Sequence, residues 1–541
     1  MMYKCAGGLA GVLVPACGRV NRNLTTLAAL CWLVTGGSEI HAGEILQNAE
    51  GIALQWDTTL RYSAGARLGQ ASSALLKNPN ADDGDRDFAP GLISNRIDFA
   101  SVLNLSKDEF GVLIGADGWY DTVYHARTDN KSPGTFNAIS VPNTEFPRAT
   151  RNLEGQYVEL GDAFAYANFA LLKSPLSVRI GRQTVLWGEG AFFDEDSIAA
   201  AQAPIDYLRN IGPLNYSNNA FLPVTQLFIS AQPIPDVTIA AYYQFERRLS
   251  RLPAVASYFS DSDVIGAGAE RLLLDNGEFL LRSANRISSD GSHFGVSLKV
   301  TLDEFDFGLY ALRYASDYPY LRFDLLSIPG PNGNSGAFYS AYPGAIDLYG
   351  ASISGYIGNS SIVAEAAVRL NAPILGGSAV QQYYSSDNGE TPMANYARAN
   401  TFHTQIASLS TFGPGSLWDS VNLTAQFGST WILDVTQNRN SIDLSREMFV
   451  SSIRALFEPH YFEVLPNLDL SLPVSFGYGL AGQSKLYFGP VAGAGDFEFG
   501  ISATYRSVWK ADLTFTAFIG PPSRQVFADR DFILFSVERS F

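Results

Sequence analysis

The sequence predicts a closed, antiparallel transmembrane β-barrel of about eighteen strands, and three observations support this prediction. Apolar and polar residues alternate in runs of about ten residues, the length that a tilted strand needs to cross a membrane. Short and long connections take turns between these runs, as they do in barrels with turns on one side of the membrane and loops on the other. Beyond Ala42 no apolar run is long enough for a spanning helix, so only a closed barrel could cross a membrane.

The composition suits a protein that is apolar outside and polar inside. Charged residues make up 17% of the 541 residues, against about 25% in ordinary soluble domains. The formal net charge is −16, and an acidic protein is a poor binder of nucleic acid. Cys5, Cys17 and Cys31 all lie in the first 42 residues, so we expect the rest to have neither a disulfide nor a thiolate metal site. No cofactor is expected.

The first 42 residues are typical of an export signal. A basic region at residues 19–22 precedes an apolar stretch from Leu24 to Val34, and a site with small residues ends at Ala42. This stretch is too short to span a bilayer, which takes about 20 residues. Residues 1–18 precede a complete signal, which suggests an over-long start. Residues 43–541 are then expected to form the barrel.

Each alternating run predicts one strand, and an even number follows if both chain ends lie on the same side of the membrane. Alternation also occurs in large soluble all-β proteins, but the export signal and the segregated loop lengths favour the barrel. The eighteen predicted strands cover residues 52–62, 93–104, 109–120, 156–171, 176–186, 223–232, 236–246, 292–301, 305–315, 346–356, 360–370, 398–410, 419–430, 449–458, 467–477, 495–506, 510–519 and 532–541.

The connection at 187–222 differs from the other long connections because it is rich in apolar residues. Asp194, Glu195, Asp196 and Ser197 precede the stretch from Ile198 to Ala203, and this pattern predicts a short helix. We expect this loop to fold into the barrel and narrow the lumen. Its large apolar residues are Phe192, Phe193, Ile205, Tyr207, Leu208 and Ile211.

The last ten residues, 532–541, alternate and end on Phe541. A last strand that ends in Phe resembles the signal by which bacterial outer-membrane barrels are recognised for assembly. Arg539 departs from that pattern at a position that is usually apolar, although near the membrane edge an arginine can reach the headgroups. The resemblance implies the outer membrane of a Gram-negative bacterium, contact with its lipids and lipopolysaccharide, and the barrel assembly machinery as a partner.

A longer resemblance centres on Arg179-Ile-Gly-Arg-Gln-Thr-Val-Leu-Trp-Gly-Glu189, followed by Phe192-Phe193, Leu222-Pro-Val224 and Tyr242-Tyr-Gln-Phe-Glu246. These segments resemble the proteobacterial outer-membrane family catalogued as domain of unknown function 1302, and residues 529–541 resemble its last strand. Genes of that family often lie beside genes for hydrophobic-compound degradation and for a lipid exporter of the RND class. The resemblance therefore implies a channel for hydrophobic small molecules or lipids, with a periplasmic lipid carrier and an RND-type transporter as partners.

The candidate site residues lie in and beside the loop at 187–222. In the functional interpretation they form a polar and aromatic constriction that contacts substrate or holds the loop inside the barrel. In the structural interpretation Trp187 belongs to the aromatic girdle at the membrane edge, and Arg182 and Glu189 form a local ion pair. The candidates are Arg179, Arg182, Gln183, Trp187, Glu189, Phe192, Phe193 and Tyr207.

Two acidic clusters could in principle hold a hard cation, because Ca²⁺ prefers several oxygen ligands. One comprises Asp82, Asp83, Asp85 and Asp87, and the other is the run 194–196. Neither has the spacing of an EF-hand. We expect the first to be a solvated acidic loop and the second to cap a helix, so no metal site is predicted.

Enzyme activity is not expected. Beyond residue 42 the chain has four histidines, and the sequence places none of them beside a serine in a nucleophilic pair. Charges of both signs are expected to face the lumen. The alternatives to a hydrophobic channel are a porin for small polar or anionic solutes and a non-conducting part of a trans-envelope lipid transport machine. The predicted lumen charges are Arg96, Asp98, Arg179, Glu246, Glu365, Arg369, Asp469, Glu498, Arg506 and Asp512.

Overall fold

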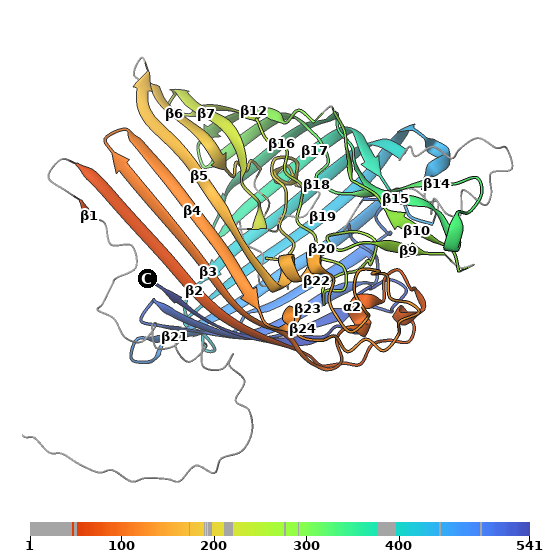
Figure 1. Cartoon of the computed structure of the whole chain (residues 1–541). Helices are drawn as coiled ribbons and strands as arrows, with labels where there is room; N and C mark the ends of the chain where they lie inside the picture. The colour runs from red at the N-terminus through yellow and green to blue at the C-terminus, as the bar shows by residue number, and fades with distance from the viewer. Residues whose placement is uncertain are drawn as a thin grey trace, which may run out of the picture.

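The computed structural model describes residues 46–47, 51–171, 174–188, 190, 192, 197–209, 220–274, 277–289, 291–375, 397–442, 445–486 and 489–541. The predicted export signal, residues 1–42, lies outside these ranges. Twenty strands form one antiparallel sheet (Figure 1). Two-residue β1 (Leu46–Gln47) pairs only with the start of β2, and β21 and β22 are two parts of one wall strand. This leaves eighteen wall strands. The last strand pairs with β2, so the barrel is closed.

Each predicted strand overlaps one wall strand, which confirms the predicted antiparallel barrel. The strand predicted at 467–477 is divided, because Pro473 has no N–H to donate between its two parts. The wall strands are β2 (Ile52–Arg67), β3 (Gly91–Lys107), β4 (Phe110–Asp121), β5 (Gln156–Leu171), β6 (Ser174–Gln183), β7 (Val224–Ile234), β8 (Val237–Gln244), β12 (Phe294–Leu302), β13 (Phe305–Tyr314), β16 (Ile346–Ile357), β17 (Ser360–Ile374), β18 (Ala397–Phe412), β19 (Ser420–Gln437), β20 (Phe449–Leu465), β21 (Leu468–Ser471), β22 (Val474–Ala481), β23 (Gly495–Tyr505), β24 (Trp509–Ile519) and β25 (Phe532–Ser540).

The short turns lie at the barrel end that also holds β1 and the carboxyl terminus (Figure 1). Three of them are two-residue connections whose first residue has a positive φ: 49° at Asp108, 54° at Asp303 and 62° at Gly358. A positive φ at that position suits hairpin turns that match the twist of the flanking strands. These residues therefore fix the register at which neighbouring wall strands pair.

The wall has an apolar outer face and a polar inner face. On β23 the side chains of Phe499 and Ile501 are 40% and 42% exposed, whereas Glu498 and Ser502 are buried. Because successive side chains point to opposite faces of a strand, the exposed apolar residues face outward and the buried polar residues face the interior. An apolar belt around a closed barrel is the surface that a lipid bilayer requires. No described helix has the length and apolar character that a membrane-spanning helix needs.

Phe541 continues the closure of the wall beyond β25. Its N–H donates to the carbonyl of Thr58 at 2.8 Å, and its own carbonyl accepts from the N–H of Thr58 at 3.3 Å. The guanidinium of Arg539 lies 4.4 Å from the ring centre of Phe541 and 5.1 Å from that of Trp509. The unusual arginine near the end of the chain is thus held between two aromatic rings. The role of Phe541 as an assembly signal stays a prediction.

Long loops gather at the other end of the barrel (Figure 1). A separate sheet forms there from β9 (Arg271–Leu273), β10 (Phe279–Arg282), β11 (Arg286–Ile287), β14 (Tyr320–Leu325) and β15 (Asn334–Tyr342). The short helical segments are η1 (Leu75–Lys77), α2 (Asp83–Arg86), η2 (Val123–His125), α3 (Arg148–Thr150), η3 (Arg151–Gly155), η4 (Ala199–Ala201), η7 (Pro331–Gly333) and η8 (Arg439–Ser441). These described parts of the long loops are therefore folded.

Residues 68–90, 122–155 and 248–270 pack together, and we call them the loop cap. Its centre is aromatic: the ring centre of Phe88 lies 6.0 Å from that of Tyr124, 5.7 Å from Phe146 and 5.5 Å from Tyr258. Phe532, the first residue of β25, belongs to the same buried cluster. The loop cap is thus anchored on the wall strand that closes the barrel.

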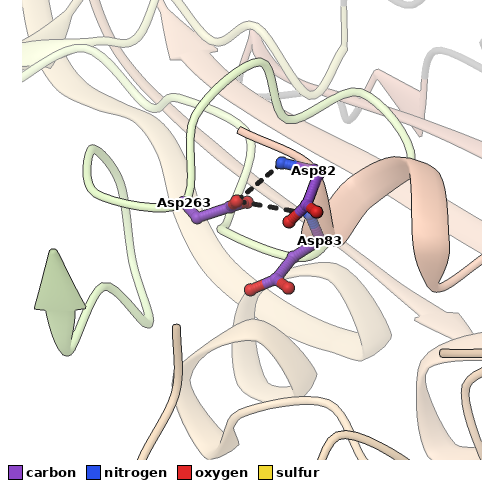
Figure 2. A group of neighbouring side chains, drawn as sticks. All are labelled: Asp82, Asp83 and Asp263. Carbon is purple, nitrogen blue, oxygen red and sulfur yellow. Dashed lines mark hydrogen bonds between the residues drawn. The ribbon is translucent and has the colours of Figure 1, made fainter. Parts of the chain in front are cut away.

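The prediction of a solvated acidic loop at residues 82–87 is wrong. Asp82, Asp83, Asp85 and Asp87 are all buried, and three buried aspartates of the loop cap appear in Figure 2. The reason is long-range pairing: Arg67 at the end of β2 and Arg530 before β25 both form ion pairs with Asp85. These two arginines, together with the aromatic cluster, hold the acidic segment inside the loop cap.

Candidate functional site

The loop that follows β6 crosses the interior of the barrel. Trp187 packs on Tyr242 of β8 and Tyr310 of β13, with ring centres 5.0 and 6.2 Å apart. Further along, the N–H of Phe192 donates to Oε1 of Gln426 on β19 at 2.7 Å, and Nε2 of Gln426 donates back to the carbonyl of Phe192 at 3.2 Å. The described part of the loop therefore runs from β6 to inward-facing residues of β19.

The loop also bonds to charged residues of β17. The N–H of Ile198 donates to Oε2 of Glu365 at 3.2 Å, and Nη2 of Arg369 donates to the carbonyl of Ser197 at 2.9 Å. Gly188 has φ +95°, and a Cβ at that position would lie 2.9 Å from Oε2 of Glu365. Glycine is favoured here, because other residues rarely adopt this φ and a Cβ would also displace the carboxylate of Glu365.

The short helix predicted in the stretch from Ile198 to Ala203 is present, but it is shorter than that stretch. Only Ala199–Ala201 adopt a helical turn, of the 3-10 type. Pro204 has no N–H to continue a helix, and the residue before a proline disfavours helical geometry. The chain instead turns at Gln202, whose carbonyl accepts a hydrogen bond from the side chain of Gln244 at 2.6 Å. The acidic residues 194–196 lie outside the described residues.

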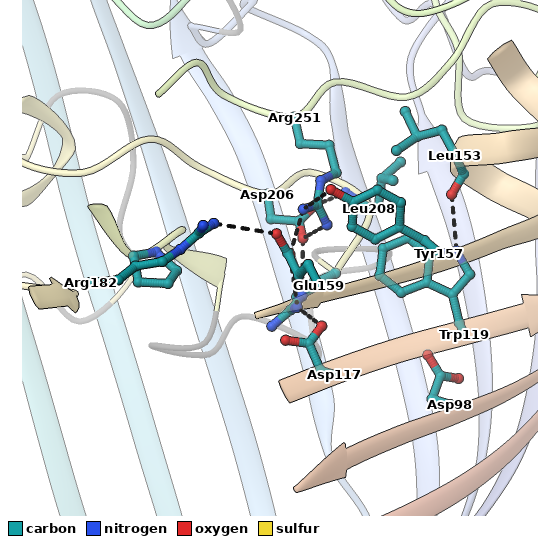
Figure 3. A network of polar contacts seen from close by, with 12 residues as sticks. Asp98, Asp117, Trp119, Leu153, Tyr157, Glu159, Arg182, Asp206, Leu208 and Arg251 are labelled. Atoms are coloured by element: carbon teal, nitrogen blue, oxygen red, sulfur yellow. Dashed lines mark hydrogen bonds and ion pairs between the residues drawn. The ribbon is translucent and has the colours of Figure 1, made fainter. Parts of the chain in front are cut away.

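A second set of contacts holds residues 205–209 of the same loop to the opposite wall (Figure 3). Its centre is Glu159 of β5, whose side chain is 8% exposed. The Glu159 carboxylate accepts from Arg248 and from Arg251, the latter at 2.5 Å. Arg182 and Arg209 lie 3.7 and 3.5 Å from it. Four guanidinium groups thus surround one carboxylate on the inner face of the wall.

Two further aspartates share these guanidinium groups. Asp206 pairs with Arg209 at 3.0 Å and with Arg251 at 2.8 Å, and Asp117 of β4 pairs with Arg209. Together with Glu159 and its four arginines, these residues form what we call the Glu159 network. The network connects two loops to β4 and β5, so it fixes the loop that crosses the barrel at a second point.

Aromatic rings orient the most buried arginine of the Glu159 network. Arg251 lies 4.4 Å from the ring centre of Tyr157 and 5.5 Å from that of Trp119, and these two rings stack at 5.0 Å. Nε1 of Trp119 donates to the carbonyl of Leu153 at 3.0 Å. Contacts between a guanidinium and a ring face are stronger when both are removed from water. The rings therefore hold Arg251 at a fixed position.

The structure brings some of the predicted site residues to the loop contacts. Arg182 joins the Glu159 network, Trp187 and Phe192 contact the wall, and the hydroxyls of Tyr207 and Tyr318 lie 2.7 Å apart. The proposed place of Trp187 in the aromatic girdle is wrong, because its ring is buried inside the barrel. Glu189 and Phe193 lie outside the described residues, so the predicted Arg182–Glu189 pair is not described.

Two other predicted residues have local roles in the wall. The side chain of Gln183 donates to the carbonyl of Gln226 at 3.1 Å, and the side chain of Gln226 donates to the carbonyl of Gln183 at 2.7 Å. Arg179 lies 4.4 Å from the ring centre of Phe228. Both residues bind neighbouring strands to each other and take no part in the Glu159 network.

Sequence reasoning missed most of the Glu159 network. The alternation in β5 could have indicated Glu159, because the exposed residues Val158 and Leu160 flank it. Its partners Arg248 and Arg251 lie in a long irregular loop, where no periodic pattern indicates direction. Of the predicted lumen charges, Arg506 lies instead in the turn between β23 and β24 and stacks on Tyr505 at 5.2 Å.

A cavity of about 330 Å³ lies against the inner face of the wall strands near the chain ends. Five acidic, two basic and one histidine side chain line it, and the few large apolar residues there are Leu456, Leu470, Ile501 and Leu534. The titratable lining residues are Glu458, Asp469, Glu498, Asp512, Glu538, Arg61, Lys510 and His460. The titratable side chains that line the interior at this end are therefore more often negative than positive.

The buried carboxyl of Glu154 should make the attachment of residues 248–270 to the rest of the loop cap depend on pH. Burial raises its pKa from 4.5 to about 7, and Asp121 adds to this, although the N–H of Ala254, Arg96 and Ser257 lower it. The packed loop cap favours the neutral carboxyl of Glu154. The contribution of Glu154 to the stability of the loop cap is therefore complete below its usual pKa of 4.5 and is lost as the pH rises through about 7. Proteolysis of residues 248–270 should therefore accelerate between about pH 5 and pH 8.

The matched variant for this prediction is Glu154→Gln, which stays neutral at every pH. We expect it to keep the hydrogen bond from the N–H of Ala254, which lies 2.8 Å from Oε1 of Glu154. The acceleration between the two pH values should be smaller than in the wild type. An identical pH profile for the two proteins would show that Glu154 does not control the attachment.

Comparison with known proteins identifies one family. A family model with the description "Protein of unknown function (DUF1302)" matches residues 23–541. A search of curated proteins finds no match.

Several solved structures are similar to this chain at low sequence identity. OpdK of Pseudomonas aeruginosa with vanillate is 10% identical, with a TM-score of 0.42, over 90% of this chain and 98% of OpdK. OccAB1 of Acinetobacter baumannii is 11% identical, with a TM-score of 0.43, over 93% and 99% of the two chains. The channel DcaP of Acinetobacter baumannii is 9% identical, with a TM-score of 0.37, over 93% and 100%.

Proposed function

This chain belongs to the DUF1302 family, whose model covers nearly its whole length, and we propose that it is an outer-membrane channel for small polar solutes. The closed wall and its apolar outer face support the location, because only closed barrels and helices satisfy every backbone group within a bilayer. The long loops, including the loop cap, then face the outside of the cell, and the short turns face the periplasm.

The polar cavity near the chain ends is the observation that carries the proposed substrate class. A solute that leaves the barrel on the periplasmic side passes eight titratable side chains. Polar groups of a solute can exchange their bonds to water for bonds to such side chains, whereas an apolar solute gains little there. The excess of acidic over basic residues favours cations and solutes with positive groups.

The apolar residues that suggested a hydrophobic substrate have another role. Ile198 belongs to a buried cluster with Trp187, Tyr242 and Leu348, and Ile205 belongs to a second cluster with Phe221. The first cluster attaches the crossing loop to the wall, and the second packs residues of the loops against one another, so these side chains are not available to line a path. Packing therefore accounts for these described apolar side chains of the loop without a hydrophobic substrate.

We infer that the loop at 187–222 constricts the lumen. It is held on one side by β17 and β19 and on the other by the Glu159 network. A segment attached at both sides of a barrel divides the cross-section of the lumen. Solutes would then pass beside the loop and meet the half-exposed arginines Arg182 and Arg209.

The proposed function predicts a cation-preferring conductance for the refolded protein in planar bilayers. In a potassium chloride gradient, the reversal potential should indicate that potassium passes more readily than chloride, because acidic side chains line the periplasmic cavity. The double variant Asp512→Asn and Glu538→Gln should move the permeability ratio toward one. Asp303→Asn is a matched control, since Asp303 lies in an exposed short turn and Asn tolerates its positive φ.

Uptake into liposomes distinguishes the two substrate classes. We expect small sugars and amino acids to enter faster than in protein-free liposomes, with no enhancement for a fluorescent fatty acid. A protein that is silent to ions and polar solutes but accelerates the fatty acid would contradict the proposal and support the hydrophobic channel. A protein that accelerates neither would fit a non-conducting envelope component.

A further inference from the structure

Three aspartates from two loops meet inside the loop cap. Asp82 and Asp83 begin α2 in the first long loop, and Asp263 comes from residues 248–270, about 180 residues later in the chain (Figure 2). One carboxylate oxygen from each lies within 4.8 Å of the other two. Their residues are 0%, 1% and 1% exposed, in that order. Three carboxylates are thus close together and removed from water.

One oxygen of each carboxylate already has a hydrogen-bond donor. Oδ2 of Asp263 accepts from the N–H groups of Asp82 at 2.8 Å and Asp83 at 3.2 Å. Oδ2 of Asp83 accepts from the N–H of Asn137 at 3.1 Å, and Oδ2 of Asp82 accepts from Arg86. These bonds fix the orientation of all three carboxylates, so that their second oxygens have fixed positions too.

The second oxygens have no donor. Oδ1 of Asp82, Asp83 and Asp263 is buried and has no hydrogen-bond partner. The same holds for both carboxylate oxygens of the neighbouring Asp87, which is also buried, and for Oδ1 of Asn137. Buried oxygens are almost always satisfied by a donor, a water or an ion. An unsatisfied oxygen on each of three clustered carboxylates indicates a ligand that the protein itself does not supply.

Positive side chains do not neutralise this cluster. Among the described residues, one ion pair reaches these carboxylates, from Arg86 to Asp82. No described ion pair reaches Asp83, Asp87 or Asp263. The nearby Arg67 and Arg530 are directed instead to Asp85, and Arg67 also to Asp529. The carboxyl groups of Asp83, Asp87 and Asp263 therefore have no ion pair with any described residue.

We propose that the loop cap binds one Ca²⁺ ion between Asp82, Asp83 and Asp263. Ca²⁺ suits a set of ligands that contains only oxygens, and it tolerates irregular geometry better than Mg²⁺ does. The absence of sulfur and imidazole among the clustered ligands disfavours zinc and copper. The ion bridges the first long loop and residues 248–270, so it strengthens the attachment of the loop cap. This site does not depend on whether the barrel conducts.

Protonation is the alternative way to remove the charge. Burial, the largest cause, raises the pKa of Asp263 to about 7, and burial together with the charge of Asp263 raises the pKa of Asp83. Without a cation, the cluster then holds protons at acidic pH and gains unfavourable charge as the pH rises. The two alternatives differ in one observable: Ca²⁺ binding releases protons, whereas a merely protonated cluster takes up no Ca²⁺.

The decisive experiment is isothermal titration of Ca²⁺ into the full chain, refolded in detergent without lipopolysaccharide and treated with EDTA. We expect one saturable site per chain, weaker binding of Mg²⁺, and slower proteolysis of residues 248–270 when Ca²⁺ is present. The variants Asp83→Asn and Asp263→Asn should each weaken Ca²⁺ binding at least tenfold. Asp324→Asn is the matched control, because Asp324 pairs with Arg286 in an exposed part of the loops.

Several outcomes would overturn the proposal. If the wild-type protein binds no Ca²⁺ at a stoichiometric site, the proposal is wrong. This result needs no variant, so the test remains valid even if a variant fails to fold. Tb³⁺ luminescence excited through tyrosine gives a second reading on the wild type, and the signal should disappear when Ca²⁺ is added. Binding that is unchanged in both aspartate variants, or lost equally in Asp324→Asn, would place the cation elsewhere.

Discussion

Glu159→Gln is expected to release residues 205–209 from the wall and to raise the single-channel conductance several-fold. The Glu159 carboxylate is the shared acceptor for four guanidinium groups, and the amide of glutamine carries no charge to offset them. Arg248 would lose its carboxylate partner in a mostly buried position, and Arg251 would keep Asp206 alone as an ion-pair partner among the described residues. Arg209 of the crossing loop would also lose its contact with Glu159, so the attachment of residues 205–209 to β5 should weaken and the lumen should open on that side.

The magnitude follows from the burial of the central pair. Glu159 and Arg251 are each 8% exposed, and removing one partner of a buried ion pair destabilises by about 3–5 kcal/mol. Asp206 retains its bonds to Arg251 and Arg209, so the lower end of this range is the better expectation. About 3 kcal/mol shifts the equilibrium between attached and detached loop by about two orders of magnitude.

Single-channel recordings of the wild type and the variant test this expectation. Glu145→Gln is the matched control, because Glu145 and Arg151 form an exposed pair at 3.9 Å in the loop cap. This control should conduct like the wild type. Equal conductance of Glu159→Gln and the wild type, with both correctly folded, would show that the Glu159 network does not set the width of the lumen.

Arg530→Met is expected to detach the loop cap from the barrel. Arg530 is 1% exposed, and its Nε donates to Asp85 at 2.9 Å, while Nη1 donates to the carbonyls of Tyr258 and Ser260, each at 2.6 Å. Methionine keeps much of the apolar stem but donates no hydrogen bond. Two buried carbonyls would lose a donor, and Asp85 would keep only Arg67 as a cation.

Loss of these contacts should destabilise the attachment by about 3–5 kcal/mol, as for other buried ion pairs that lose a partner. Limited proteolysis should cut residues 248–270 at least a hundredfold faster than in the wild type. The barrel itself should stay folded, so the unheated variant should migrate in SDS gels as the unheated wild type does. Arg524→Met is the control, because Arg524 is exposed and donates to the carbonyl of Ala492 alone. Equal cleavage of Arg530→Met and the wild type would contradict the assignment.

The wall could be predicted from the sequence because its pattern is local. Side chains in a strand alternate between lipid and lumen, so the alternation within each run of about ten residues is enough to predict that strand. Even the division of one wall strand into β21 and β22 follows from a single residue, because Pro473 has no N–H to donate. The boundaries differ by a few residues where strands continue past the membrane edge, as β19 does from its predicted end at 430 to Gln437.

The loops could not be predicted in the same way, because distant residues decide their structure. Asp85 is adjacent to other acids, and composition alone suggests a solvated loop. It is buried because Arg530, 445 residues away, reaches it. Likewise Arg248 and Arg251 have no pattern that directs them to Glu159. The helix predicted at 198–203 is limited to one 3-10 turn for a reason visible in the sequence, since Pro204 follows directly.

The closure of the wall between β2 and β25 also constrains the order in which the protein can assemble. Thr59 pairs with Ser540 and Arg67 with Phe532. The first wall strand, β2, can therefore pair with β25 only after the ribosome has synthesised the end of the chain. Until then one edge of β2 has open hydrogen-bonding groups, which lipid cannot satisfy. Insertion must therefore be nearly simultaneous with closure, or a partner must protect that edge. The pair of Arg67 and Asp529, 462 residues apart, can form only after this event.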